Sequence, residues 1–158
     1  MPIDRKHLGR RYGPYAFSVG LQHVKDFVAA TGGGVPGHVF SAPPEQAHPL
    51  TWDEAAARAG PHGGIVAPPA FATTFAMEPF AKACSDPEVG LNVLRLVHGE
   101  QDLEFLEPIR PGDLLTTSGE ITRVQERGNL DFLEVTSTTT NQHGRTVVRG
   151  VWTAIVRN

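Results

Sequence analysis

One segment, residues 70–83, constrains this chain more than any other feature, because it is apolar on nearly every side when it is read as a helix. It has the sequence AFATTFAMEPFAKA, and its large apolar side chains are spread over most of the helix circumference: Phe71, Phe75, Met77 and Phe80. A helix of this kind is normally buried. The sequence therefore predicts a central helix around which the rest of the chain folds.

The start of this helix is predicted at Pro68 and Pro69. Proline is tolerated at the first helical position, where its missing amide would have had no partner. Pro79 is expected to kink the helix or to mark the beginning of its last turn, since proline cannot donate the helical hydrogen bond.

Two shorter helices are predicted earlier in the chain. Apolar residues recur at helical spacing from Leu21 to Val28, and the glycines at 32–34 end that helix. A second helix is expected from Thr51 to Gly60. Thr51 and Glu54 have the spacing of a capping box, and Gly60 is expected to end the helix in a left-handed conformation.

The second half of the chain, residues 91–158, is predicted to form about four long antiparallel strands. Sequences typical of turns separate the strands at residues 108–113, 127–129 and 141–144. Helices followed by strands indicate the α+β class. Long strands and one all-apolar helix together predict a single domain, residues 1–158, in which a curled sheet wraps around the helix.

Composition excludes several kinds of partner. A net charge of -3, with no basic stripe, argues against nucleic acid. No run approaches the roughly 20 apolar residues that a membrane-spanning helix needs. The first residues lack the apolar stretch of a signal peptide, and Cys84 is the only cysteine. A cytoplasmic protein is therefore expected.

Three stretches of the sequence resemble one protein family. Residues 96–113, LVHGEQDLEFLEPIRPGD, resemble the strand and turn of MaoC-like hydratases and dehydratases, and residues 64–71, GIVAPPAF, resemble the entrance to their central helix. Residues 15–31 resemble their N-terminal strand and helix. The similarity is greatest to the N-terminal-half subfamily, which resembles the fatty-acid-synthase-type dehydratase domain. It implies a hot-dog fold for nearly the whole chain.

Members of this family add water to trans-2-enoyl thioesters, or remove it from (3R)-3-hydroxyacyl thioesters, on coenzyme A or acyl carrier protein. Their catalytic loop has the form S/T-G-D-x-N-P-x-H, and residues 31–38 of this chain read TGGGVPGH. Pro36 and His38 match the pattern, but Gly33 stands at the Asp position and Val35 at the Asn position. One imidazole without its carboxylate is poorly equipped both to take a proton from carbon and to deliver one to oxygen.

The resemblance therefore implies an accessory subunit of a heterodimeric (3R)-hydroxyacyl-ACP dehydratase. A second hot-dog subunit would supply the intact Asp and His, and the substrate would be an acyl-CoA or acyl-ACP thioester. A homodimer that uses His38 is the alternative. No cofactor is expected.

A substrate site along the central helix is also implied. Backbone amides at a helix start can stabilise the negative charge that grows on the thioester oxygen. Pro68 and Pro69 have no N–H, which leaves the amides of Ala70 and Phe71, so this entrance is better suited to closing a pocket. The residues expected to bind the substrate are Pro68, Pro69, Ala70, Phe71, Phe75 and His98.

Several residues have a simpler interpretation beside the functional one. For His98, pairing across neighbouring strands is favoured over lining the acyl site. Asp113 is expected to be a turn residue, and Cys84 to be buried rather than nucleophilic. The glycines at 32–37 formally match a dinucleotide-binding motif, but they follow a helix rather than a strand. The seven histidines show no zinc spacing.

Two other functions stay open. One is a non-catalytic hot-dog module that binds an acyl thioester without converting it. The other is a thioesterase, which shares the fold. A thioesterase would need a carboxylate near the helix start, and Glu78 lies two turns beyond the predicted start.

Overall fold

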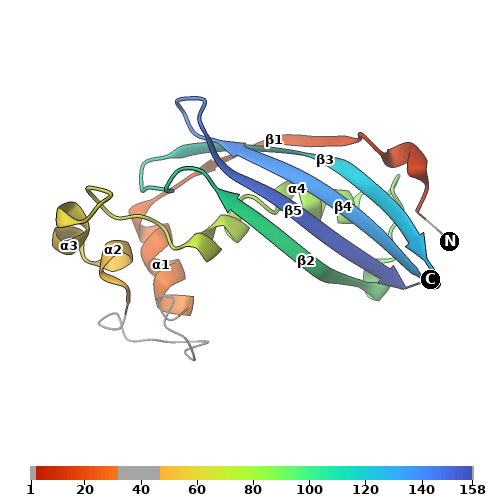
Figure 1. The fold of residues 1–158 in the computed structure, drawn as a ribbon, viewed down its shortest axis with the longest axis horizontal. Helices are drawn as coiled ribbons and strands as arrows, with labels where there is room; N and C mark the ends of the chain where they lie inside the picture. The colour runs from red at the N-terminus through yellow and green to blue at the C-terminus, as the bar shows by residue number, and fades with distance from the viewer. Residues whose placement is uncertain (1–2, 32–46, 158) are drawn as a thin grey trace.

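A computed structural model of the chain describes residues 3–31 and 47–157. Four long strands follow the helices as predicted, and one further strand near the N-terminus precedes them (Figure 1). The elements are the short 3-10 helix η1 (Arg5–His7), β1 (Arg11–Ser18), α1 (Leu21–Thr31), α2 (Pro49–Trp52), α3 (Glu54–Ala59), the 3-10 helix η4 (Pro69–Thr74), α4 (Glu78–Ser85), the 3-10 helix η5 (Val93–Arg95), β2 (Leu96–Phe105), β3 (Leu114–Arg127), β4 (Leu130–Thr140) and β5 (Thr146–Arg157).

The strands form one antiparallel five-stranded sheet in the order β1-β3-β4-β5-β2. The sheet curls over α4, while α1, α2 and α3 lie together beyond one end of it and both termini lie at the other end (Figure 1). The predicted hot-dog arrangement, a long curled sheet around a central apolar helix, is confirmed.

Alternation along the strands decides which side of the sheet faces the helix. On β4, every second residue from Asp131 to Thr139 is buried, and the residues between them are only partly buried. Trp152 of β5 is fully buried on the same face, and its indole N–H donates to Ser137 Oγ at 2.9 Å. We call this face, which packs on α4, the concave face, and the opposite one the convex face.

The central helix is buried as predicted, but the prediction of one continuous helix is wrong. The segment divides into η4 and α4, and Phe75 leaves the helical conformation between them, with φ -135°. In a continuous α-helix, the amide of residue 79 would donate to the carbonyl of Phe75, and Pro79 has no amide to donate. Pro79 instead occupies the first turn of α4, where that amide is not needed. Phe71, Phe75 and Phe80 are all at least 95% buried.

The predicted helix from Thr51 to Gly60 is also divided. Thr51 lies within α2, and its hydroxyl donates to the carbonyl of His48 at 2.8 Å, so the expected capping box does not form. Asp53 caps α3 instead, because its carboxylate accepts from the amides of Ala55 and Ala56.

Gly60 does end the helix, but with φ -82°, so the predicted left-handed conformation is wrong. A Cβ atom at Gly60 would lie 2.6 Å from Leu50 Cδ2, so a larger residue here would require the Leu50 side chain to move.

The predicted turn at residues 108–113 is confirmed, and Asp113 holds it. The Asp113 carboxylate, 8% exposed, accepts from the amide of Arg110 at 2.8 Å. The Asp113 amide donates back to the Arg110 carbonyl, and the Asp113 carbonyl accepts from Val19. Asp113 is therefore a structural residue that ties β3 to the end of β1.

Candidate functional site

The candidate site is a pocket of about 340 Å³ beside the start of η4, which we call the entrance pocket. The chain between α3 and η4 forms one wall, and the end of β2 with the turn after it forms the other. Its lining is mainly apolar: His62, Val66, Ala67, Pro69, Phe105, Leu106, Glu107, Pro108 and Ile109. The wall is fixed by the Ala67 amide, which donates to the carbonyl of Ile109 at 2.8 Å.

A second pocket of about 290 Å³ lies on the other side of the central helix, against β1. We call it the β1 pocket. Its residues are Pro14, Tyr15, Ala16, Phe17, Thr74, Phe75 and Glu78. Three of these residues, Thr74, Phe75 and Glu78, lie at or next to the break between η4 and α4.

The residues that were predicted to bind the substrate do not all lie in one pocket. Pro69 lines the entrance pocket and Phe75 lines the β1 pocket. Pro68 and Ala70 lie beside Pro69 at the start of η4, Pro68 partly buried and Ala70 exposed.

Phe71 lies in neither pocket but in a cluster of aromatic rings. Its ring centroid is 5.5 Å from that of Phe27, 6.2 Å from that of Phe17 and 6.3 Å from that of Phe75. Since Phe71 is also 1% exposed, its evident role is to pack α1, β1 and η4 together.

The start of η4 offers fewer free amides than the sequence indicated. The amide of Phe71 donates to the carbonyl of Pro68 at 2.9 Å. Of the two amides expected to be available, only that of Ala70 has no acceptor among the described residues. An oxyanion hole is normally built from more than one fixed donor, so this entrance by itself is a weak one.

His98 lies on the concave face of β2, where the helix leaves the strand open. Its ring centroid is 5.1 Å from that of Phe80 in α4 and 5.9 Å from that of Trp152 in β5, and the side chain is still exposed. Nε2 is 3.2 Å from the carbonyl of Glu100. If Nε2 carries the proton and donates to it, Nδ1 is the nitrogen left to accept from a bound molecule.

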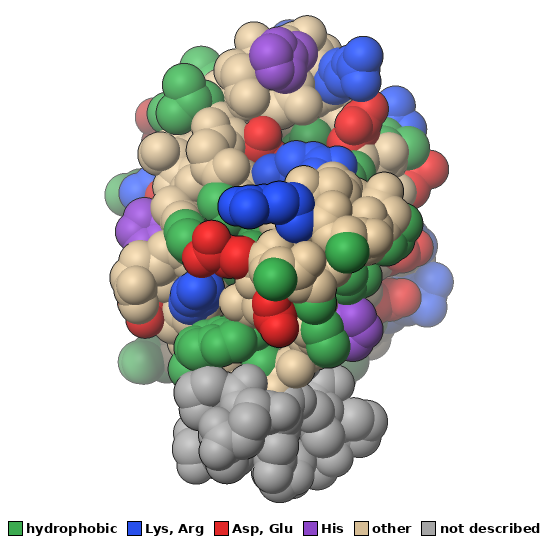
Figure 2. All heavy atoms as spheres, turned by 90° about the vertical axis from the view of Figure 1, so that its left-hand side faces the viewer, with side chains coloured by type: hydrophobic (Ala, Val, Ile, Leu, Met, Phe, Trp, Pro, Cys, Tyr) green, Lys and Arg blue, Asp and Glu red, His purple; other side chains and the backbone are tan. Residues whose placement is uncertain are grey.

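The end of the molecule formed by α1, α2 and α3 carries basic, acidic and apolar side chains mixed together (Figure 2). Lys25 on α1 lies over the Trp52 ring, 5.5 Å from its centroid, and pairs with Glu54 at 3.4 Å. Arg110 donates to the carbonyl of His62 at the rim of the entrance pocket. Two of the cations at this end, Lys25 and Arg110, are thus already engaged with neighbouring groups.

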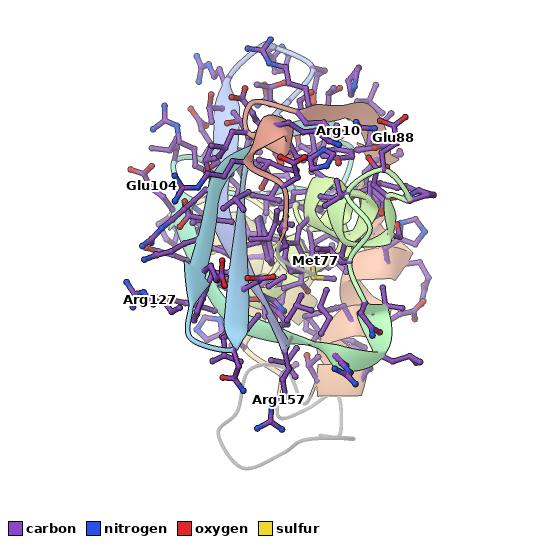
Figure 3. The ribbon with its side chains drawn as sticks, turned by 90° about the vertical axis from the view of Figure 1, so that its right-hand side faces the viewer. Arg10, Met77, Glu88, Glu104, Arg127 and Arg157 are labelled. Atoms are coloured by element: carbon purple, nitrogen blue, oxygen red, sulfur yellow. The ribbon has the colours of Figure 1, made fainter. Side chains whose placement is uncertain are left out.

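Met77 and Cys84 belong to the interior around α4. Figure 3 shows Met77 between the sheet and the helices, consistent with its partial burial against the core. Burial raises the pKa of the Cys84 thiol to about 11. A thiol that stays protonated near neutral pH is a poor nucleophile, which favours the structural interpretation of Cys84.

Glu78 was predicted to lie two turns beyond a helix start, and this prediction is wrong. Because the central helix is broken, Glu78 is the first residue of α4, at the wall of the β1 pocket. It pairs with Lys82 at 3.4 Å. The proline at position 79 was the signal that could have located this second helix start.

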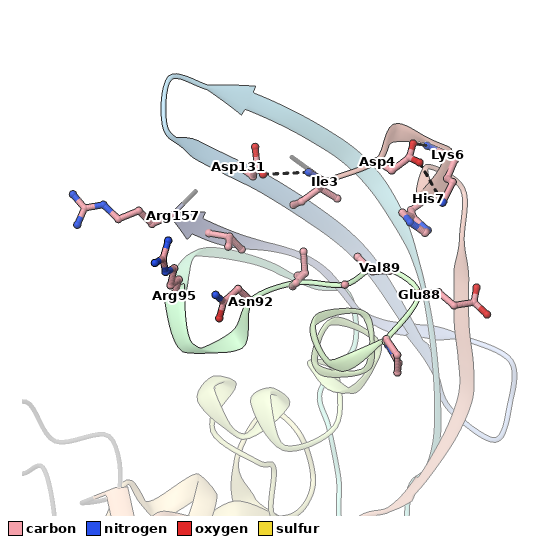
Figure 4. Close-up of a pocket in the computed structure, with 14 residues that line it drawn as sticks. Ile3, Asp4, Lys6, His7, Glu88, Val89, Asn92, Arg95, Asp131 and Arg157 are labelled. Carbon is pink, nitrogen blue, oxygen red and sulfur yellow. Dashed lines mark hydrogen bonds and ion pairs between the residues drawn. The ribbon is translucent and has the colours of Figure 1, made fainter. Parts of the chain in front are cut away.

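A third cavity of about 330 Å³ lies at the opposite end of the sheet, between the N-terminal segment and the chain that joins α4 to β2 (Figure 4). Asp131, 2% exposed, accepts from the amide of Ile3 at 3.1 Å and so fixes the N-terminal segment over the sheet. The Arg157 side chain points away from the cavity. This arrangement attaches the N-terminal segment and lies far from η4.

The loop at residues 31–38 is largely outside the described residues, so Gly33, Val35, Pro36 and His38 have no structural account. Within residues 3–31 and 47–157, no group of three His, Cys, Asp or Glu side chains could hold a metal ion. None of the described helices is long and apolar enough to cross a membrane.

Comparison with protein families gives one match that covers most of the chain. Residues 6–149 match the family described as FAS1-like, dehydratase domain region. The UPF0336 protein of Saccharopolyspora erythraea is 31% identical over 158 residues, which are 99% of this chain and 93% of that protein. The UPF0336 protein SCO4636 of Streptomyces coelicolor is 30% identical over 99% of this chain and 95% of its own length.

Solved structures agree with this match. A MaoC-like dehydratase is 26% identical, with a TM-score of 0.79 over 96% of this chain but 42% of its own. The C-terminally truncated HadBC complex of Mycobacterium tuberculosis, a (3R)-hydroxyacyl-ACP dehydratase, is 25% identical, with a TM-score of 0.75 over 94% of this chain and 96% of the matched one. The (R)-hydratase of A. caviae, 19% identical with a TM-score of 0.65, shares the fold.

Proposed function

Since the chain belongs to the FAS1-like dehydratase family, within the MaoC-like hot-dog hydratases and dehydratases, we propose that it is the substrate-binding subunit of a (3R)-3-hydroxyacyl-thioester dehydratase or trans-2-enoyl-thioester hydratase. The acyl group of an acyl-CoA or acyl-ACP thioester lies in the entrance pocket. A second hot-dog subunit supplies the Asp and His that move the protons.

The observation that carries this proposal is the position of the entrance pocket. It is mainly apolar, it lies at the start of the central helix, and one of its walls is the end of β2, on whose outer side no other described strand pairs. Apolar pockets with a few polar groups are typical of small-molecule sites. A subunit paired along β2 would close the pocket on its open side and turn it into a channel between the two chains.

The parts of the chemistry that this chain provides are binding and orientation. Pro69, Val66 and Phe105 exclude water from the acyl group, and the Ala70 amide offers one hydrogen bond to the thioester oxygen. Pro68 fixes the approach to η4, Phe71 and Phe75 hold the helix against α1 and β1, and His98 borders the channel on the concave face. In the hydration direction, the partner's groups add the hydroxyl to C3 and a proton to C2.

The test is an enoyl-CoA hydration assay with the purified chain alone and with a candidate hot-dog partner that carries the intact G-D-x-N-P-x-H loop. Activity is expected only with the partner. If neither preparation hydrates crotonyl-CoA or a longer enoyl-CoA, the proposal is wrong. If the chain alone is active and His38→Ala abolishes that activity, the homodimer that uses His38 replaces the accessory role.

Two pocket-filling variants test the location of the substrate. Ala67→Phe fills the entrance pocket without removing the Ala67 backbone hydrogen bond, and Ala16→Phe does the same in the β1 pocket. Ala67→Phe is expected to raise KM for long acyl chains at least tenfold, about 1.4 kcal/mol of binding, while Ala16→Phe leaves KM unchanged. The opposite pattern would place the acyl chain along β1.

A non-catalytic acyl-thioester binding module is the second candidate, because one free amide at the start of η4 and the altered loop both weaken the case for chemistry. Tight acyl-CoA binding without turnover in any pairing would favour it. The thioesterase alternative gains one observation, since Glu78 begins α4 beside the β1 pocket. Acyl-CoA hydrolysis that Glu78→Gln abolishes would establish that activity.

A further inference from the structure

The β2 edge has a charge pattern that determines what can pair with it. Opposite β5, Glu100 faces Thr153, Asp102 faces Val151 and Glu104 faces Arg149. Thr153, Val151 and Arg149 alternate along β5 with residues that are buried on the concave face. The three carboxylates opposite them therefore form a row on the convex face. Figure 3 shows Glu104 projecting outward on the side of the sheet away from α4.

Two of these carboxylates have no counter-charge among the described residues. Glu104 pairs with Arg149 at 3.2 Å, whereas no described Lys, Arg or His lies within ion-pair distance of Glu100 or Asp102. All three side chains are exposed. The middle of the edge strand is therefore acidic and available.

Apolar side chains flank this acidic row at both ends of the edge. Leu94 is 94% exposed and Val97 59% exposed before it, and Phe105 and Leu106 are 41% and 44% exposed after it. Exposed apolar side chains grouped in this way are typical of an interaction surface. Together with the free backbone groups of an edge strand, they indicate a strand of another chain as the occupant.

Pairing with a second copy of the same strand would oppose like charges. A two-fold axis through the edge keeps side chains on their own face, so each convex residue meets a convex residue of the other copy. An axis at Asp102 brings Asp102 against Asp102 and Glu100 against Glu104. An axis one residue earlier or later brings Asp102 against Glu100 or against Glu104. Like charges directly opposite each other destabilise a strand pair.

We infer that the β2 edge binds a different hot-dog chain, one whose edge strand carries Lys or Arg opposite Glu100 and Asp102, in preference to a second copy of this chain. This inference rests on the proposed function for the hot-dog nature of the partner. The acidic row selects the partner by charge, and the apolar ends and backbone hydrogen bonds supply most of the affinity.

The test uses the chain itself as a model partner. The triple variant Glu100→Lys, Asp102→Lys, Glu104→Lys is mixed with the unmodified chain, and association is measured by sedimentation velocity at low salt. The mixture is expected to associate at least about tenfold more tightly than either protein alone, and added salt should reduce the difference. A neutral triple variant, Glu100→Gln, Asp102→Asn, Glu104→Gln, is expected to associate with itself more tightly than the unmodified chain.

The matched control reverses three carboxylates away from the β2 edge: Asp26 and Glu126, which are exposed, and Glu120, which is partly buried and has an ion pair as Glu104 does. Its mixture with the unmodified chain should show no such gain. A tight dimer of the unmodified chain that neither salt nor the neutral variant strengthens would overturn the inference, as would an equal gain with the control. These measurements contain no substrate, so a failed hydration assay leaves them unaffected.

Discussion

The two edges of the sheet differ in how readily a further strand could pair with them. On the β1 edge, Pro14 has no amide to donate, and a bulge between Tyr12 and Tyr15 interrupts the register. The β2 edge also has an irregular register, between His98 and Glu100, but it runs for ten residues without proline. Of the eight exposed large hydrophobic side chains among the described residues, five lie between Val93 and Leu106, on or beside β2.

The β1 edge is also tied down from the side of α4. Arg10 pairs with Asp86 at 2.8 Å and with Glu88, and Figure 3 shows Arg10 and Glu88 side by side. The Tyr12 hydroxyl donates to Asp86 at 2.8 Å. Proline, bulges and charge are ordinary means of blocking an edge. Proline and these ion pairs close the β1 edge, whereas β2 has no proline and carries the exposed apolar side chains of the inferred interface.

The largest expected effect comes from a methyl group on the closed edge. A Cβ atom at Gly13 would lie 2.7 Å from the backbone carbonyl of Thr117, and φ there is +100°. Gly13→Ala is therefore expected to cost at least about 2 kcal/mol of unfolding free energy, measured by urea denaturation.

Gly99→Ala on the open edge is the control for this substitution. Its Cβ atom would meet the side chain of Ile155, which can move, so the cost should be less than half as large. Equal costs at the two glycines would show that the edges are equally rigid.

Removal of an exposed apolar side chain should separate association from stability. Leu94→Ser is expected to weaken binding of the β2 partner by about 1 kcal/mol or more, because the partner covers the side chain, while the stability of the chain alone changes by less than about 0.5 kcal/mol. Titration calorimetry against the partner measures the first quantity. Leu8→Ser, 46% exposed on the β1 side, should leave binding unchanged; a loss there would extend the interface beyond β2.

The smallest expected effect is a pH dependence of the closed edge. Burial alone would raise the pKa of Asp86, but the Glu88 amide, the Tyr12 hydroxyl and the Arg10 guanidinium together lower it. A carboxyl with a lowered folded pKa stabilises the fold above its ordinary value of 3.8, and this stabilisation is lost as pH falls through the folded pKa.

Asp86→Asn should therefore reduce stability at pH 6 by roughly 0.5–1 kcal/mol and flatten the decline on acidification. Urea midpoints between pH 2 and 7 measure both. Asp102→Asn on the open edge is the control, and it should leave the decline of the unmodified chain in place. If both variants flattened the decline in stability, the pH dependence would not be specific to the β1 edge.

Much of the fold was accessible from local patterns. The alternation after residue 91 predicted the four long strands, the helical spacing from Leu21 predicted α1, and the apolar stretch at 70–83 predicted burial. The site was less accessible. The amides of both Ala70 and Phe71 were predicted to be free, but the Phe71 amide donates to the carbonyl of Pro68. Which acceptor an amide finds depends on the turn that the backbone adopts.

The sequence by itself determined that a long antiparallel sheet encloses an apolar segment, because periodicity and burial are properties of neighbouring residues in the chain. It also contains the residues on which later features depend: Pro79 in the first turn of α4, Asp53 at the start of α3 and the acidic residues of β2. Only the tertiary structure decided that the central helix breaks at Phe75, that Asp53 rather than Thr51 caps α3, and that β2 is the open edge. The open edge depends on the strand order, which pairs segments that lie far apart in the chain. The helix break and the cap depend on which of several neighbouring groups the backbone turn brings within hydrogen-bond distance, and the residue pattern offered more than one candidate for each.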